Sequence, residues 1–268
     1  MIEFQWSKRD KTQTPVMFNT DIWEYAELLV GDYKPRLLKE PGELNGLHFI
    51  ESYLGANLDF MDLYCEKNEI LAGATTFNKE RVKVFDREHL CTRYYEIPAD
   101  TIIIDNDSMT KYGDGFAKFT QMHEAGHFFL HPAVYRKCAE QLSLFDEPAP
   151  SIVCCRISVM EQSLKPKAKS FTPEERREQQ ANVFAAFTMM PRQTFIPIAT
   201  ELIKKAGFRD GIFVDQYGAY YELKGICEAI ASVYGVSKTA AKLHLKELKL
   251  LMDEEQYVAH KAQVSMGL

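Results

Sequence analysis

The sequence predicts an α+β fold in which a small, mostly antiparallel sheet packs against helices. Three observations carry this prediction: strand-like segments cluster in the first 105 residues, helical patterns flank them, and the chain after residue 207 is compactly helical. We therefore expect two domains. The first, residues 1–205, holds the sheet, and the second, residues 206–268, is a smaller helical subdomain.

The N-terminal half begins with helical patterns and then changes period. Residues 20–31 place Ile22, Ala26, Leu29 and Val30 on one helical face and end at Gly31, and a second short helix is predicted over 42–54. The next segments are short, several are rich in β-branched and aromatic residues, and polar turns separate them. These predicted strands cover residues 58–64, 70–77, 81–85 and 100–105.

The second half alternates helices with one irregular segment. A helix is predicted over about 115–131, an irregular segment over 139–173 with a possible strand at 151–159, and helices from 172 and over 192–205. Thr172, Pro173 and Glu175 form the pattern of a capping box with proline in the first turn, so the helix from 172 has a defined start. A compact helical segment follows from about 219 to 252.

The composition is that of an ordinary globular protein and excludes several classes. Of the 268 residues, 46% are hydrophobic, and the net charge of −6 argues against bulk binding of nucleic acid. No segment resembles a signal peptide or reaches the apolar length of a membrane span. The six cysteines include no CxxC pair, which favours reduced thiols over a disulfide framework. We expect a cytoplasmic protein that does not enter the membrane.

The stretch MHEAGHFFLH, residues 122–131, places titratable side chains in an otherwise apolar helix. His123 and His127 are one turn apart on the same face, so their imidazoles can meet one zinc ion while Glu124 reaches a water bound to it. Gly126 in the same helix indicates that another element approaches closely. The alternative is a pair of core histidines that are hydrogen-bonded to the protein.

A catalytic zinc needs a third protein ligand, and three glutamates of the helix from 172 compete for that role. Glu175 is explained by the capping box, and Glu174 by the favourable position of a carboxylate in the first turn. Glu178 lies on the small, apolar face, where a carboxylate needs a partner. It is therefore the predicted third ligand. One turn later Asn182 is placed to hold a ligand histidine by its second ring nitrogen.

The remaining polar residues of this helix are predicted to face solvent. They are Arg176, Arg177, Gln179 and Gln180.

Together the two motifs resemble those of the ImmA/IrrE-type metallopeptidases over roughly residues 115–191. HEAGH is followed by E-x-x-A-N-x-F-A-A-x-x-x-M-P, here Glu178, Ala181, Asn182, Phe184, Ala185, Ala186, Met190 and Pro191. Ala125 and the pair Phe187 and Thr188 stand where leucines are more usual, and neither departure removes a ligand. The resemblance implies a zincin-like fold and one zinc ion.

In that family the two histidines and this glutamate bind zinc. Carried over, the ligands are His123, His127 and Glu178, and the catalytic base is Glu124. Zinc would lower the pKa of its bound water toward ~7, and Glu124 would pass the water's proton to the leaving amine. The donor to the oxyanion stays open among His131, Tyr112, Tyr135 and Tyr220.

The resemblance also implies an endopeptidase of narrow specificity. Its expected substrate is a partner protein such as the helix-turn-helix repressor of a phage or mobile element. The segment 132–172 lies between the two metal-binding helices and could cover or edge the cleft. The alternative is that this segment is a tolerated surface insertion.

A second pattern occupies residues 227–251. Ala231, Gly235 and the Val236-Ser237 pair have helix-turn-helix spacing. One side of the second helix carries a basic stripe of Lys238, Lys242, Lys246 and Lys249. The alternative function is thus a DNA-binding regulator whose metal site is structural. A solvated lysine face is the preferred interpretation, because four lysines in an acidic chain release few counterions.

Overall fold

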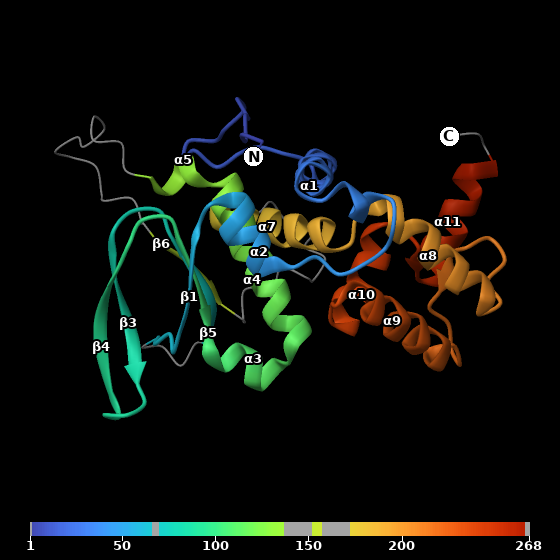
Figure 1. Ribbon diagram of the computed structural model, residues 1–268. Helices are drawn as coiled ribbons and strands as arrows, with labels where there is room; N and C mark the ends of the chain where they lie inside the picture. Colours follow the sequence, from blue (N-terminus) through green and yellow to red (C-terminus); the bar gives the residue numbers. More distant parts are fainter. Residues whose placement is uncertain (1, 66–69, 137–151, 157–171, 266–268) are drawn as a thin grey trace.

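The computed structural model describes residues 2–65, 70–136, 152–156 and 172–265. The strands found between residues 57 and 156 lie at one side, the helices of residues 192–265 lie at the other, and α4 (Asp114–Leu130) and α7 (Pro173–Met189) lie between them (Figure 1). This mixture confirms the α+β class. Among the described residues, no helix has the length and apolar character needed to cross a membrane.

The main sheet has four strands in the order β1-β5-β2-β6. They are β1 (Asn57–Met61), β5 (Thr101–Asp105), β2 (Leu71–Thr76) and β6 (Ile152–Arg156). β1 runs parallel to β5, whereas β2 runs antiparallel to both β5 and β6. All five residues of β5 are buried, which agrees with the three successive isoleucines at its centre.

The predicted strand at 151–159 is present as β6. Its described part is Ile152–Arg156, and residues 151 and 157–159 lie outside the described residues. β6 joins the sheet by pairing with β2, with Thr75 opposite Val153 and Gly73 opposite Cys155. A segment that follows the HEAGH helix in the chain therefore returns to the sheet beside that helix.

A separate two-stranded hairpin is formed by β3 (Glu80–Asp86) and β4 (Cys91–Ile97). β3 was predicted, but β4 was not. Six of the seven β4 residues are exposed and only Ile97 is buried. Because no face of β4 is buried along its length, its sequence does not alternate between apolar and polar residues as a half-buried strand does. Val82 and Val84 of β3 pack with Ile97 and with Ile103 of the main sheet.

The first helices deviate from the predicted bounds. α1 covers Asn19–Tyr33 and continues past Gly31, where the sequence pattern placed its end. The segment predicted as one helix over 42–54 consists of a short helix α2 (Gly46–His48) and a π-helical turn η2 (Phe49–Leu54), which closes on Gly55 in the left-handed conformation. Between α1 and α2 lies the 3₁₀ turn η1 (Pro35–Leu38).

The two central helices begin and cross as their sequences indicate. Thr172 and Glu175 form the reciprocal capping box of α7. A Cβ atom placed on Gly126 of α4 would lie 3.1 Å from the Cα atom of Ala181 in α7. The missing side chain therefore lets the two helix backbones approach, and this close approach brings His123 and His127 to the glutamate of the facing helix.

Short helices flank α4 on either side. They are α3 (Asn106–Tyr112) and α5 (Pro132–Tyr135).

The C-terminal part is helical with one small two-stranded parallel pairing. α8 (Arg192–Lys205) is followed by β7 (Phe213–Val214), α9 (Tyr220–Tyr234), α10 (Lys238–Glu247), β8 (Leu251–Met252) and α11 (Glu254–Ser265). The main buried core contains side chains from both sides of the proposed boundary at 205/206. That division of the chain stays a prediction.

Candidate metal centre

Three nitrogen and oxygen donors from α4 and α7 converge on one point. The Nε2 atoms of His123 and His127 are 3.1 Å apart, and each lies 3.4 Å from a carboxylate oxygen of Glu178. A tetrahedral metal with bonds of about 2.0–2.1 Å separates its ligand atoms by about 3.3 Å. The two nitrogens, and the two oxygens of Glu178 that each lie beside one of them, therefore have a spacing that fits a single ion of zinc type.

The three donors are buried, and their electrostatics favour a cation between them. His123 and His127 are fully buried and Glu178 is 4% exposed. Burial alone would raise the pKa of the Glu178 carboxyl, but without a metal the protonated imidazoles of His127 and His123 outweigh it and hold that pKa well below its usual range. Within the described part of the chain, Glu178 Oε2 accepts no hydrogen bond. A buried carboxylate oxygen without a partner is costly, and a bound metal would supply that partner.

A chain of hydrogen bonds orients His127. The backbone carbonyl of Pro15 can only accept, so the Gln180 side chain donates to it through Nε2 (2.8 Å). Gln180 Oε1 then accepts from His131 Nε2–H (2.9 Å), which leaves His131 Nδ1 to accept from His127 Nδ1–H (3.1 Å). The lone pair of His127 is thereby placed on Nε2, the atom that faces Glu178.

His131 takes part in this chain as a neutral imidazole. Burial drives its pKa well below the usual value, and the neighbouring His127 lowers it further. Both ring nitrogens are engaged and the side chain is fully buried. This position gives His131 a role in orienting His127 rather than in contacting an oxyanion.

His123 is oriented from the opposite helix. Its Nδ1 lies 2.8 Å from Asn182 Oδ1, so the amide oxygen accepts and the lone pair of His123 is left on Nε2. This is the contact that the spacing of Glu178 and Asn182 on α7 predicted. Both histidines therefore present the same ring nitrogen to Glu178.

Glu124 lies beside the three donors and is fully buried against the sheet. Its Oε2 accepts a 2.6 Å hydrogen bond from the Thr75 hydroxyl of β2, whereas its Oε1 has no hydrogen-bond partner among the described residues. Burial raises the pKa of this carboxyl to about 7. A carboxyl with that pKa can take and return a proton near neutral pH, as a general base must.

The sheet makes room for this carboxylate at Gly73. A Cβ atom on Gly73 would lie 3.0 Å from both Cγ and Oε1 of Glu124. Because side chains alternate along a strand, Gly73 and Thr75 share the face of β2 that meets α4. The sequence analysis missed both residues, since only the pairing of a distant strand with the helix reveals them.

Gln180 was predicted to face solvent, and that prediction is wrong. The side chain is 3% exposed because it connects His131 to Pro15. The pattern of α7 could not show this, since both partners come from distant parts of the chain. Arg177, also predicted to face solvent, is half-buried and donates to the hydroxyl of Tyr135.

The other candidates for the oxyanion donor are spread over different environments. Tyr112 and Tyr220 are exposed, whereas Tyr135 is buried and accepts the hydrogen bond from Arg177. The choice among the tyrosines stays open.

The basic stripe of the C-terminal helices is partly neutralised. Lys238 pairs with Glu228 at 3.0 Å, and Lys242 lies 3.9 Å from Asp215. Gly235 ends α9 in the left-handed conformation, and the hydroxyl of Ser237 caps α10.

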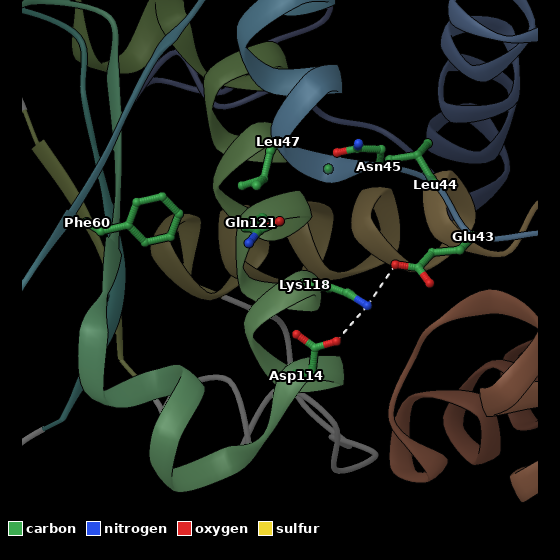
Figure 2. Close-up of a pocket in the computed structure, with 9 residues that line it drawn as sticks. Glu43, Leu44, Asn45, Leu47, Phe60, Asp114, Lys118 and Gln121 are labelled. Atoms are coloured by element: carbon green, nitrogen blue, oxygen red, sulfur yellow. Dashed lines mark ion pairs between the residues drawn. The ribbon is translucent and has the colours of Figure 1, made fainter.

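A surface pocket lies on the other side of α4. Lys118 pairs there with Glu43 and Asp114, each at 2.7 Å (Figure 2). By helical geometry, Asp114 and Lys118 lie on the face of α4 opposite His123 and His127. The pocket is lined by Glu43, Leu44, Asn45, Gly46, Leu47, Phe60, Asp114, Lys118 and Gln121, and it is separate from the metal centre.

The comparison with protein families supports a peptidase. The peptidase M78 family model, described as the IrrE N-terminal-like domain, matches residues 159–246. This match confirms the resemblance to the ImmA/IrrE family. The matched range includes Glu178 and Asn182, while the HEAGH motif precedes it. The match supports a peptidase, and specifically a metallopeptidase. No curated protein matches the chain.

Proposed function

We propose that the protein is a zinc-dependent endopeptidase of narrow specificity. The observation that carries the proposal is the convergence of three donor side chains, with 3.1–3.4 Å between their facing atoms, beside a buried carboxyl whose pKa is raised to about 7. His123, His127 and Glu178 would hold the metal, and Glu124 would act as the general base. The family match supports the same class of enzyme.

The roles of the residues follow from their environments. Zinc held by these residues would supply Lewis acidity toward a water molecule and toward the scissile carbonyl. Glu124 takes the proton of that water and delivers it to the leaving amine. Thr75 holds one oxygen of Glu124, so the oxygen without a partner, Oε1, is the one available for the proton. Asn182 and His131 keep the two ligand histidines in the required tautomers.

The burial of the site supports restricted access. Glu124 and both histidines are fully buried in the described structure, so an arbitrary peptide does not reach them from solvent. A specific partner that rearranges the site on binding satisfies this requirement. We therefore propose a regulatory partner protein as substrate, such as a phage or mobile-element repressor. We also propose a cytoplasmic location, because the cysteine pattern favours reduced thiols.

Metal analysis tests the ligand assignment. We expect one zinc per chain in the wild-type protein and none in Glu178→Ala, whereas Glu174→Ala on the exposed first turn of α7 should retain the metal. Unchanged zinc in Glu178→Ala would show that the third ligand is misassigned.

Co-incubation with the protein encoded next to this chain tests the activity. We expect the wild-type protein to cleave that partner, to leave casein largely intact, and to lose the activity in a chelator. Glu124→Gln should keep zinc and fold but lose cleavage. Rapid digestion of unrelated unfolded proteins would contradict narrow specificity while leaving the peptidase assignment intact.

The regulator alternative makes a different prediction. If regulation in the host survives Glu124→Gln but fails when Lys238, Lys242 and Lys246 are neutralised, then DNA contact and not proteolysis is the function.

A further inference from the structure

β6 brings one cysteine to the proposed metal centre. Cys155 lies directly opposite Gly73 in the antiparallel pairing of β6 with β2. Directly opposed residues of such a pair project from the same face of a sheet. The face at Gly73 is the one that meets Glu124, so the Cys155 thiol enters the same space and is fully buried there.

The thiol joins residues of the centre rather than an apolar core. One donor atom each from His123, Glu124 and Cys155 lie within 4.8 Å of one another. His123 is thus shared between this cluster and the cluster that it forms with His127 and Glu178.

Unsatisfied buried oxygens provide a second, independent indication of a ligand. Glu124 Oε1 and Glu178 Oε2 are both buried, and neither has a hydrogen-bond partner in the described part of the chain. Two such oxygens from residues that both lie near His123 are expected where a cation belongs, because native proteins rarely leave buried polar atoms unpaired.

We propose that zinc bound at this centre takes the Cys155 thiol as its fourth protein ligand, so that the sulfur moves the short way from its set with His123 and Glu124 and closes the loaded centre. The inference rests on the proposed function, since it takes the metal at His123, His127 and Glu178 as given. Thiolate sulfur is a preferred ligand of zinc, and a coordinating thiol loses its proton. Four protein ligands are the mark of a closed site, whereas a catalytic zinc keeps one position open.

The consequence is a latent enzyme. Cys155 fills the position that catalysis requires, so peptide hydrolysis needs Cys155 to leave. β6 is a short strand at the edge of the sheet and pairs only with β2 among the described strands. A sheet edge of this kind also accepts an added peptide strand. A partner that takes the place of β6 on β2 would remove the sulfur and open the centre in one event.

X-ray absorption at the zinc edge tests the ligand directly. Zinc–sulfur scattering at about 2.3 Å is distinct from zinc–nitrogen and zinc–oxygen scattering at about 2.0–2.2 Å. We expect one sulfur neighbour in the zinc-loaded wild-type protein and none in Cys155→Ser or Cys155→Ala. Cys154→Ser is the matched control, because the adjacent residue of β6 projects from the opposite face and should retain the sulfur signal.

Activity provides the second measurement. Cys155→Ser should cleave the partner protein faster than the wild-type protein at equal zinc content, and Cys154→Ser should not. Zinc bound through nitrogen and oxygen alone in the wild-type protein would overturn the sulfur ligand and leave the proposed peptidase standing. Absence of zinc from the wild-type protein would overturn both.

Discussion

At the scale of single residues, the centre depends on side chains that do not contact the metal themselves but orient its proposed ligands. Gln180 is the clearest example, because its amide sets the tautomer of His131, which in turn sets the tautomer of His127. A leucine at position 180 could neither donate to the Pro15 carbonyl nor accept from His131, so both rings would be free to turn. The residue has no place in the ligand set, yet it fixes which nitrogen His127 presents.

Gln180→Leu should therefore weaken zinc binding. We expect a loss of about 10-fold in affinity, the lower end of the usual effect of removing a direct partner of a ligating histidine, because Gln180 acts on His127 through His131. Competition with a chromophoric chelator measures it, with the neighbouring Gln179→Leu as the control. Equal affinities in the two variants would show that the chain of hydrogen bonds does not orient His127.

The buried carboxyl of Glu124 has a consequence for the stability of the metal-free protein. Its pKa rises from 4.5 to about 7 on folding, chiefly through burial. Between these two pH values the folded state binds more protons than the unfolded state, so the free energy of unfolding falls as pH rises through this window. Above pH 7 the full cost is present, and it amounts to about 3 kcal/mol.

Glu124→Gln should remove this cost. We expect the metal-free variant to match the wild-type protein near pH 4.5 and to be more stable by up to about 3 kcal/mol at pH 8. Urea denaturation of both proteins in a chelator at several pH values measures the difference. A constant difference across this range would show that Glu124 is not buried as a protonated carboxyl.

At the scale of elements, features encoded by local sequence patterns were predicted better than features that depend on pairing between distant segments. The capping box of α7, the i, i+4 histidines and the glycine at the helix crossing are all local patterns, and the structure has each at the predicted position. β4 was not predicted because its exposed residues show no alternation of apolar and polar side chains. Gln180 and Cys155 acquire their environments from α4 and β2, so neither could be placed from its own element.

The crossing of α4 and α7 allows a paired test of two helical glycines. Gly225 of α9 has open space where a Cβ would lie, so Gly225→Ala should stabilise the protein by up to about 1 kcal/mol through helix propensity. Gly126→Ala has the same gain but sets its Cβ 3.1 Å from the Ala181 backbone, and overpacking costs about 1–3 kcal/mol.

We expect Gly126→Ala to be destabilised on balance and to bind zinc more weakly, because the ligands sit on the two helices that would separate. Urea denaturation and zinc competition on both variants provide the comparison. Equal stabilisation of Gly126→Ala and Gly225→Ala would mean that the contact between α4 and α7 accommodates a Cβ atom at position 126.

At the scale of the whole molecule, one histidine connects the C-terminal helices to the centre of the protein. His244 of α10 is buried against the rings of Phe187 in α7 and Phe195 in α8, and its Nε2–H donates to the Met190 carbonyl at 2.9 Å. Since α7 carries the proposed ligand Glu178, α10 supports the helix on which the site is built. The matched family range also extends into α10, to residue 246.

His244 should make this connection sensitive to acid. Burial lowers its pKa from 6.5 to about 3, so the folded state keeps the ring neutral while the unfolded state takes up a proton. The stabilising contribution is complete above pH 6.5 and is lost progressively as pH falls toward 3, by about 3 kcal/mol at pH 4.5.

His244→Leu should be less stable than the wild-type protein at pH 7.5 by about 1–3 kcal/mol, because the Met190 carbonyl loses its donor. Its stability should then decline less between pH 6.5 and 4.5, and the two proteins should converge in acid. Urea midpoints across this range measure the difference, with His260→Leu on α11 as the control outside the core. Parallel pH profiles for the wild-type protein and His244→Leu would refute the assignment of a neutral, buried histidine at this junction.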